Sequence, residues 1–254
     1  ISSQRHLLCE YIRQQQRQVR NMTYTKFSQL IERAAQRIQK TRCAVVSPED
    51  GHTIAAVVRA GRERLIEPIL IGDEARITEL LAEYGCEKSA VTIYHEPDQK
   101  AAVQKAIDLI HAGQADCIMK GLIKTAQFMH AILKRENDLR TENLVSMLSI
   151  RELPHYHKLI AFTDAGICMN PTLDKKRQII ENAVRTMTAM GYENIKVGVL
   201  ASVEVVNPRM KDSVEAAELK RMNQEGIITG CAVENVCPHI YLNSRSKASG
   251  ERSL

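Results

Sequence analysis

The segment 117–125 combines residue types that can bind an anion at the point where a predicted strand is followed by a predicted helix. The apolar run Cys117–Met119 is typical of a buried strand; it ends at Lys120 and Gly121, and a helical pattern begins near Thr125. Glycine lets the backbone approach a ligand, a helix N-terminus offers unpaired N–H groups, and lysine adds a positive charge. The segment therefore predicts a phosphate-binding turn, and a solvated lysine at a strand end is the alternative for Lys120.

Two common nucleotide motifs do not occur in the sequence. The spacing G-x-x-x-x-G-K-[ST] of the phosphate-binding loop in many nucleotide hydrolases is missing, and so is the dinucleotide fingerprint G-x-G-x-x-G. The predicted anion site therefore has no motif support as a nucleotide hydrolase or a nicotinamide enzyme.

Arg140 stands in a short connection between a predicted helix and the apolar run that starts at Leu144. Its planar guanidinium can hold two phosphate oxygens at once. The alternatives are an ordinary surface arginine, or an arginine neutralised by the nearby Asp138.

Asp164 directly follows an apolar run, where a carboxylate must find hydrogen-bond donors or lie in a wet cleft. Asn170 stands shortly before the next predicted helix. The functional hypothesis is that both line a cleft for a polar ligand. The structural alternative is that both accept backbone N–H groups in turns.

Other candidates have weaker support. His155 and His157 flank Tyr156 without a third ligand at a recognised spacing, so we expect no metal site. Cys168 could be a nucleophile, but no histidine is placed by the sequence to activate it, and a buried small residue is the favoured interpretation.

Regular alternation of helical and apolar segments sets the expected fold. Helices are predicted at 25–40, 51–65, 74–84, 98–112, 125–135, 173–190 and 213–224, and strands at 42–47, 68–72, 91–95, 117–119, 144–150, 158–163 and 196–202. The strands contain few polar residues, which is typical of strands covered on both faces. The pattern predicts an α/β protein of mainly parallel sheets with helices on both faces, whose ligands bind beyond the carboxyl ends of the strands.

Composition limits the classes of function. The chain has 254 residues, 44% of them apolar, with a formal net charge of +5. No run approaches the roughly 20 apolar residues of a membrane helix, and no secretion signal is recognisable. The seven cysteines are scattered without CxxC spacing, as is typical of reduced cysteines in a cytoplasmic protein. Much of the excess positive charge lies at the two ends, and stacking aromatics are few, so a nucleic-acid partner is not expected.

Both ends differ from the middle. Residues 1–21 are rich in Gln and Arg and precede the first methionine, Met22, so we expect a polar extension. From residue 235 to 254 the repeating pattern stops, and the end is typical of a disordered tail. The expected domain scheme is an extension over 1–21, an α/β region over 22–234 and an atypical tail over 235–254.

Several short motifs, in order, resemble those of the phosphate acetyl/butyryltransferase family, with the butyryl branch most similar. They are Ala44-Val-Val-Ser-Pro-Glu-Asp50, Glu67-Pro-Ile-Leu-Ile-Gly-Asp73, Met119-Lys-Gly121, Leu139-Arg-Thr141, Thr163-Asp-Ala165 and Gly226-Ile-Ile-Thr-Gly230. Each motif alone is weak, whereas their joint order is fairly specific. The likeness covers residues 41–234.

The resemblance implies two α/β domains with a cleft between them, similar to the isocitrate and isopropylmalate dehydrogenases. It implies the reaction acyl-CoA plus phosphate to acyl phosphate plus CoA. CoA is then a substrate, no cofactor or metal is needed, and a homo-oligomer is expected. In the transfer a carboxylate takes the proton of the CoA thiol, while cationic and hydroxyl groups hold the phosphate. The substrate-binding residues implied here are Lys120, Gly121, Thr125, Arg140, Thr141, Asp164 and Asn170.

One departure from the family concerns the C-terminal residues. Family members continue past a stretch such as Gly230–Glu234 into a segment that carries the general-base aspartate and a Ser-Arg pair. Here Asn235 opens an unrelated sequence, as expected of a truncation or a shifted reading frame. The catalytic residues therefore stay unassigned, and a truncated homologue that only binds CoA or phosphate is the main alternative. A third hypothesis is an acyl-phosphate enzyme that works with acyl carrier protein.

Overall fold

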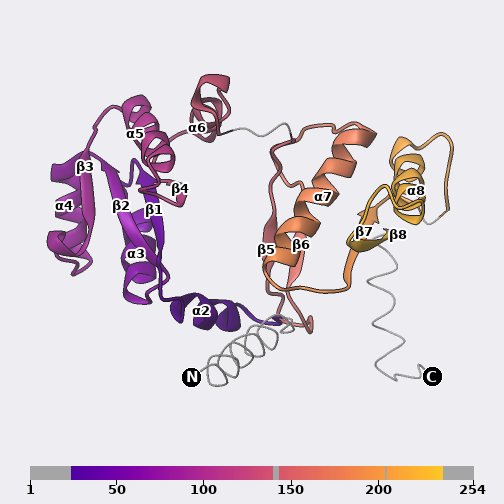
Figure 1. The fold of residues 1–254 in the computed structure, drawn as a ribbon, viewed down its shortest axis with the longest axis horizontal. Helices are drawn as coiled ribbons and strands as arrows, with labels where there is room; N and C mark the ends of the chain where they lie inside the picture. Colours follow the sequence, from indigo (N-terminus) through magenta and orange to yellow (C-terminus); the bar gives the residue numbers. More distant parts are fainter. Residues whose placement is uncertain (1–23, 140–142, 204, 237–254) are drawn as a thin grey trace, which may run out of the picture. The chain divides into compact units, whose positions relative to one another are not determined.

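The computed structural model describes residues 24–139, 143–203 and 205–236 (Figure 1). The chain divides into two compact units. The N-terminal unit is Phe27–Asn143, and the C-terminal unit comprises the described residues of Leu144–Leu254 together with residues 24–26. The predicted extension 1–21 lies outside the described residues.

The N-terminal unit is built around a four-stranded sheet in the order β3-β2-β1-β4, with every neighbouring pair parallel. Its elements are α2 (Phe27–Ala35), β1 (Thr41–Val46), α3 (Gly51–Arg62), β2 (Ile66–Gly72), α4 (Glu74–Glu83), a 3-10 turn (Lys88–Ala90), β3 (Thr92–His95), α5 (Gln99–His111), β4 (Cys117–Lys120), α6 (Thr125–Ile132) and a second 3-10 turn (Arg135–Asn137). In the central strand β1, Val46 pairs with Ile71 of β2 and with Lys120 of β4. All four strands therefore end at the same edge of the sheet.

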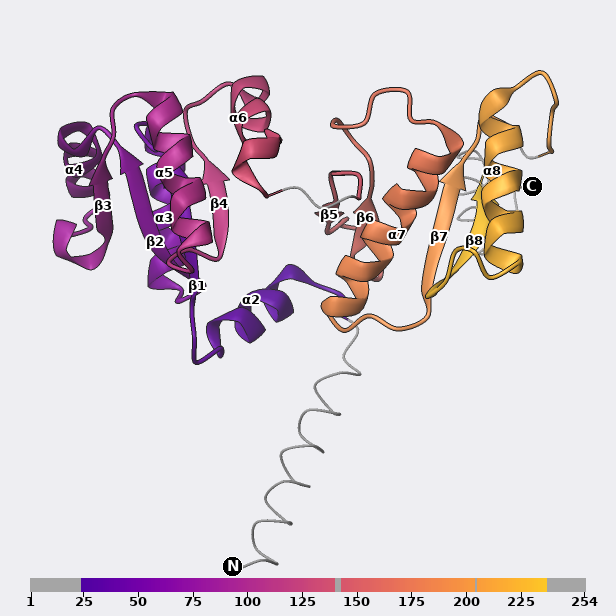
Figure 2. The ribbon, with the colours of Figure 1, turned by 45° about the horizontal axis from the view of Figure 1, so that its top comes forward.

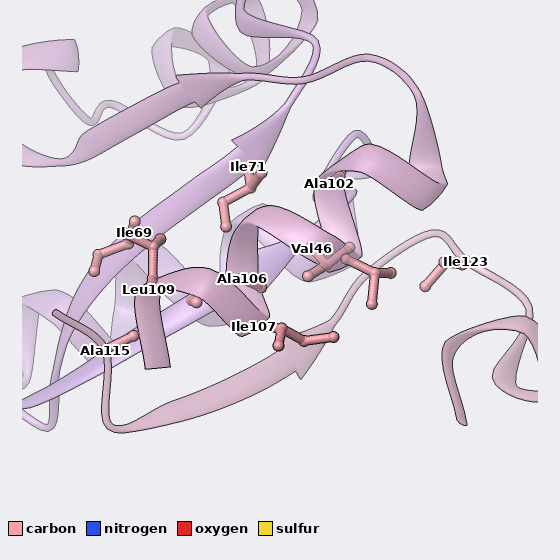
Figure 3. Packing of buried hydrophobic residues seen from close by; sticks show 11 residues of the cluster. Val46, Ile69, Ile71, Ala102, Ala106, Ile107, Leu109, Ala115 and Ile123 are labelled. Carbon is pink, nitrogen blue, oxygen red and sulfur yellow. The ribbon is translucent and has the colours of Figure 1, made fainter. Parts of the chain in front are cut away.

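Alternate strand residues pack into two separate cores, one on each face of this sheet. One face carries Ala44, Val46, Ile69 and Ile71, packed against α5 and partly buried residues of α6. Figure 3 shows Val46, Ile69 and Ile71 directed toward Ala102, Ala106 and Leu109. The other face carries Cys43, Val45 and Leu70, packed against α3 and α4. Because helices cover both faces, the last four residues of β1 and the last five of β2 can be apolar and buried without alternation.

Aspartates begin three helices of this unit. Asp50, Asp73 and Asp98 are the N-cap residues of α3, α4 and α5, and each side chain accepts a hydrogen bond from a backbone N–H of the first turn. Such caps satisfy N–H groups that have no partner within the helix. The start predicted at Asp98 is confirmed, and Gly113, with a φ of 64°, follows the end of α5 as expected for a helix stop.

Helix α2 is shorter than its sequence pattern predicts. It ends at Ala35, and the side chain of Lys40 donates a hydrogen bond to the Ala35 carbonyl at 2.8 Å. Ile38, counted on the apolar stripe of a helix 25–40, is fully exposed. The apolar periodicity predicts a continuous helix here. It does not show that a lysine side chain can take the place of the next turn by donating to a carbonyl at the end of the helix.

The C-terminal unit contains two two-stranded sheets. Its elements are β5 (Ser149–Arg151), β6 (Ile160–Phe162), α7 (Leu173–Ala189), β7 (Ile195–Leu200), α8 (Lys211–Gln224) and β8 (Cys231–Val236). Figure 2 shows α7 beside β7 and α8 beside β8. Gly191, with a φ of 94°, lies two residues beyond the end of α7.

Strands β5 and β6 are shorter than predicted and antiparallel, with Ile150 opposite Ala161. Only residues 152–159 connect them, and they contain no helix. A parallel connection needs a crossover of a dozen or more residues, so this short connection can only join antiparallel strands. The fold is thus α/β with mainly parallel strands, and this pair is the antiparallel exception among the described residues.

Strands β7 and β8 are parallel, with Val197 paired to Val233. Their core contains Ile180, Val184, Leu219, Ile228 and Val233 from α7, α8, β8 and the chain before it. Strand β8 continues through Asn235 to Val236, two residues into the segment predicted as a tail. Residues 237–254 of that segment lie outside the described residues.

Candidate functional site

The turn after β4 is held tightly against the end of β1. The Gly121 N–H donates to the Val46 carbonyl at 2.7 Å, and the Leu122 N–H donates to the Ser47 carbonyl at 2.6 Å. A Cβ atom on Gly121 would lie 2.2 Å from the Ser47 carbonyl oxygen. Glycine is therefore required here by the approach of a neighbouring backbone, a reason that the sequence pattern does not reveal.

Lys120 is the last residue of β4 and is exposed. Its Nζ lies 3.3 Å from the Ile123 carbonyl oxygen, so the ammonium group lies over its own turn. Gln99 in α5 donates from Nε2 to the Leu122 carbonyl at 2.8 Å and fixes the same turn from another side. The positive charge thus lies beside a backbone segment held by contacts from two other elements.

Thr125 is the first residue of α6, as predicted. The residue before it, Lys124, is the N-cap and provides no side-chain cap for the first turn. This differs from α3, α4 and α5, whose N-termini are capped by aspartates. The start of α6 therefore combines helical N–H groups, two lysines and an exposed threonine, which suits an anion.

The other residues at this edge have structural partners. Oε1 of Glu49 accepts a hydrogen bond from the Asp73 N–H at 2.8 Å, linking the loops after β1 and β2. Ser47 is buried and has a left-handed φ of 50°. The His95 Nδ1 accepts from the Glu74 N–H at 3.2 Å. The side chains of Glu49 and His95 thus hold the loops at this edge together, and Lys120 at the end of β4 adds an exposed cation.

Two predicted site residues cannot be placed. Arg140 and Thr141 lie outside the described residues, so their proposed contacts with phosphate stay predictions.

Asp164 follows β6 in the C-terminal unit, and backbone groups surround its carboxylate. Its Oδ1 accepts from the N–H groups of Gly166 and Ile167, both at 2.8 Å, and its Oδ2 accepts from Met147 at 2.9 Å. Partial burial opposes ionisation, but these N–H donors outweigh it and lower the pKa of Asp164. This matches the structural alternative of a turn-forming aspartate.

Asn170 is exposed and has a left-handed φ of 48°, a conformation that asparagine tolerates better than most residues. It therefore serves the turn before α7. Asp164 and Asn170 belong to the C-terminal unit, whereas Lys120, Gly121 and Thr125 belong to the N-terminal unit. Their sharing of one ligand stays a prediction.

Cys168 does not have the environment of an activated nucleophile. Its Sγ lies 3.4 Å from the Val145 carbonyl, and burial together with the Asp164 charge raises the pKa of Cys168.

The ring of His157 lies against that of Tyr156, with centroids 4.7 Å apart. In the part of the chain that the structure describes, no group of three or more His, Cys, Asp or Glu could hold a metal ion. Within the same residues, no helix is long and apolar enough to cross a membrane.

Solved structures define the class of fold. A branched-chain phosphotransacylase from Enterococcus faecalis V583 superposes with a TM-score of 0.69 at 21% identity, covering 84% of this chain and 75% of that one. The EutD phosphotransacetylase from Staphylococcus aureus gives a TM-score of 0.61 at 14% identity, with 82% and 72% covered. The described units therefore have the fold of phosphotransacylases. The expected likeness to the isocitrate and isopropylmalate dehydrogenases stays a prediction.

Sequence comparison identifies the family. The model of the family "Phosphate acetyl/butaryl transferase" matches residues 88–233. The phosphate acetyltransferase of Thermotoga maritima is 39% identical over 193 residues, which are 76% of this chain and 65% of that protein. The phosphate butyryltransferase of Clostridium acetobutylicum is 34% identical over 208 residues, 82% of this chain and 69% of that protein. The chain belongs to this family, and it spans about two thirds of the length of these relatives.

Proposed function

We propose that this protein is an acyltransferase that moves an acyl group between coenzyme A and inorganic phosphate. The observation that carries the proposal is the family match over residues 88–233, which includes the turn from Lys120 to Thr125. The local geometry of that turn supports it, because a lysine, an ordered backbone turn and a helix start without a side-chain cap lie together.

In the proposed reaction the sulfur of coenzyme A attacks the carbonyl carbon of an acyl phosphate. A carboxylate takes the thiol proton, and the C–O bond to phosphate breaks, which leaves inorganic phosphate and a thioester. The leaving phosphate carries the negative charge, so the ammonium group of Lys120 and the first N–H groups of α6 are proposed to stabilise it. The hydroxyl of Thr125 adds a donor, and Gly121 allows the turn that places them. The carboxylate that accepts the proton stays unassigned.

Further site residues rest on the family resemblance. Arg140 is proposed to hold two phosphate oxygens through its guanidinium, with Thr141 beside it. Asp164 and Asn170 are proposed to shape the polar wall of the same cleft, in addition to their turn-forming contacts.

The acyl group is proposed to be short, such as butyryl. The relatives named above include both an acetyl and a butyryl transferase. One methylene in an apolar pocket changes the free energy by only about 1–3 kcal/mol, so a modest preference is expected. A cytoplasmic location and a homo-oligomeric state also stay predictions.

The test is the phosphate-dependent release of coenzyme A from butyryl-CoA and acetyl-CoA, followed with a thiol reagent. Lys120→Ala is expected to raise the KM for phosphate by about tenfold, since a charge-assisted contact contributes roughly 1.5 kcal/mol. Lys134→Ala is the matched control, because Lys134 pairs with the exposed Glu136 away from the turn.

The possible outcomes separate the alternatives. Equal phosphate KM values for Lys120→Ala and Lys134→Ala would remove the proposed role of Lys120. Calorimetric binding of coenzyme A by a folded sample without turnover would favour a homologue that only binds. Turnover of acylated carrier protein in preference to acyl-CoA would favour the hypothesis of an acyl-phosphate enzyme that works with acyl carrier protein.

A further inference from the structure

Two cysteines face each other across strands β1 and β4, at the end of the sheet opposite the candidate site. Cys43 of β1 and Cys117 of β4 are direct register partners. Neighbouring strands lie about 4.7–4.9 Å apart, which is within the Cα separation of about 4.4–6.8 Å that disulfides span. The backbone therefore holds two cysteines at a separation that a disulfide can bridge.

Both thiols lie on one face of the sheet. Residues paired directly across two strands direct their side chains to the same side. Cys43 and Met119, which alternates with Cys117 along β4, both contact the core formed with α3 and α4. The Sγ of Cys117 lies 4.0 Å from the carbonyl oxygen of Arg42, the residue just before Cys43 in β1.

The residues just before the two cysteines clamp the strands together. The guanidinium of Arg42 donates to Asp116 through Nε at 3.1 Å and through Nη2 at 2.7 Å. Two further hydrogen bonds join the same residues: the Arg42 N–H donates to Oδ2 of Asp116, and the Asp116 N–H donates to the Arg42 carbonyl, both at 2.8 Å. Nη1 of Arg42 also donates to the Gly113 carbonyl at 2.6 Å. This clamp fixes the relative register of the two neighbouring cysteines.

The two thiols differ in access to solvent and in charge. Cys117 begins an edge strand and is exposed, whereas Cys43 is buried, with 5% of its surface accessible. The hydrogen bond from Cys43 lowers the pKa of Cys117 to about 7, although partial burial and the charge of Asp116 act in the opposite direction. The exposed thiol is therefore the more nucleophilic of the two near neutral pH.

We propose that Cys43 and Cys117 form a peroxide-sensitive dithiol, in which Cys117 reacts first and Cys43 resolves the product as a disulfide. The Cys117 thiolate attacks one oxygen of a peroxide, the O–O bond breaks, and hydroxide leaves as water after taking a proton from solvent. The Cys117 sulfenic acid forms. The sulfur of Cys43 then loses its proton and attacks the Cys117 sulfur. The S–O bond breaks, and hydroxide leaves with that proton as a second water.

The product is expected to be reversible. Cys117 is exposed, and accessible disulfides are reduced readily. A dithiol reductant therefore returns both cysteines to thiols. The bond would join the same two strands that lead to Ser47 and Lys120.

Peptide mapping of the full chain tests the pairing. Trypsin cleavage gives the peptides 43–59 and 106–120, each with a single cysteine. After treatment with hydrogen peroxide and blocking of free thiols, we expect these peptides to be linked in a non-reducing digest and separated after dithiothreitol. A Cys117 that stays reduced, or that is linked to any other cysteine, overturns the proposal.

Variants separate the roles of the two thiols. Cys117→Ser abolishes the linked peptides, and Cys43→Ala leaves a sulfenic acid on Cys117 that dimedone traps. Cys86→Ser is the matched control and keeps the link. Cys43→Ala also removes the hydrogen-bond donor, so alkylation of Cys117 at pH 7 slows about threefold, the net of a lower thiolate fraction and a higher intrinsic nucleophilicity. An unchanged alkylation rate and no trapped sulfenic acid would contradict the assigned order of reaction.

Discussion

The two units bury their strands to different extents, although both contain parallel pairs. In the N-terminal unit the last four residues of β1 and the last five of β2 are buried. In the C-terminal unit β7 alternates between half-buried and exposed residues along its whole length. Its half-buried residues Ile195, Val197 and Val199 contact the core with α7 and α8, while Leu200 is 63% exposed. Coverage by helices on both faces, rather than parallel pairing itself, determines where successive strand residues can be buried without alternation.

The difference bears on how precisely each unit can hold a functional group. The turn after β4 donates hydrogen bonds to the end of β1 and accepts one from α5, and its strand is attached to a sheet with two cores. The turn after β6 is attached to a two-stranded sheet of three-residue strands and is held largely by the Asp164 carboxylate. A rigid support is expected for Lys120, and a less firmly supported turn is expected around Asp164.

The largest expected effect comes from matched leucines in the two units. Leu70 in β2 is completely buried, so Leu70→Ala is expected to destabilise the N-terminal unit by about 2–5 kcal/mol. Leu200→Ala in β7 is expected to change stability by less than about 0.5 kcal/mol. Hydrogen exchange measured on peptides from β2 and β7 distinguishes the units, because one unfolding curve need not describe both. Similar losses for the two variants would show that β7 is covered in solution.

A smaller effect is expected from matched glycines. Gly121→Ala brings a Cβ within 2.2 Å of the Ser47 carbonyl oxygen, so the turn must shift, at a cost of about 1–3 kcal/mol. Gly166→Ala, in the turn after β6, meets no atom within 4 Å and is expected to be neutral. Thermal unfolding measures the stability of both variants. If Gly121→Ala leaves the stability unchanged, the turn can move enough to accept a Cβ atom. The glycine would then be needed for the approach of a ligand instead.

The pH dependence of the turn after β6 provides a third test. The folded pKa of Asp164 is lowered, so its contribution is complete above the unfolded pKa of about 3.9 and is lost as the pH falls through the folded value. In Asp164→Asn the amide nitrogen cannot accept the Met147 N–H, and a loss of about 1 kcal/mol at pH 7 is expected for this partly exposed group. The variant then loses less stability than the wild type on acidification.

Asp50→Asn is the control for this test in the other unit. Asp50 caps α3 by accepting from the Thr53 N–H at 2.9 Å, and asparagine is an equally good N-cap residue. The stability of the Asp50→Asn variant at pH 7 is expected to differ from that of the wild type by only about a few tenths of a kcal/mol. Urea denaturation between pH 3 and pH 7 compares both variants with the wild type. Equal acid sensitivity of Asp164→Asn and the wild type would mean that another carboxylate controls this range.

Local sequence signals predicted most of the N-terminal unit because each element carries its own start and stop. Helix α5 shows this, since Asp98, its apolar periodicity and Gly113 define it without reference to the rest of the chain. The Lys120-Gly121 turn and the start of α6 at Thr125 were predicted for the same reason. The clamp of Arg42 on Asp116 was not, because its partners are 74 residues apart in sequence.

In the C-terminal unit the prediction was less complete. Apolar runs at 144–150 and 158–163 indicated strands, but only three residues of each form one, and their antiparallel pairing depends on the short connection between them. Strand β8 was missed because Cys231–Val236 follows a glycine-rich segment and lies beside a sequence that lacks periodicity. The expectation that all strands are covered on both faces fails at β7, where Lys196 and Leu200 are exposed.

The smallest effect is expected from exposed charges on α8. Arg221 pairs with both Glu218 and Glu225, three residues before it and four after it, and the three side chains are 30–53% exposed to solvent. Glu218→Gln leaves the pair with Glu225 intact, and solvent screens the lost attraction, so no measurable shift in the thermal midpoint is expected. Glu225→Gln is the matched control, and raising the salt concentration should affect neither variant more than the wild type. A clear, salt-sensitive loss of thermal stability in either variant would mean that surface ion pairs stabilise the C-terminal unit. In the N-terminal unit, helices on both faces of the sheet provide that stability.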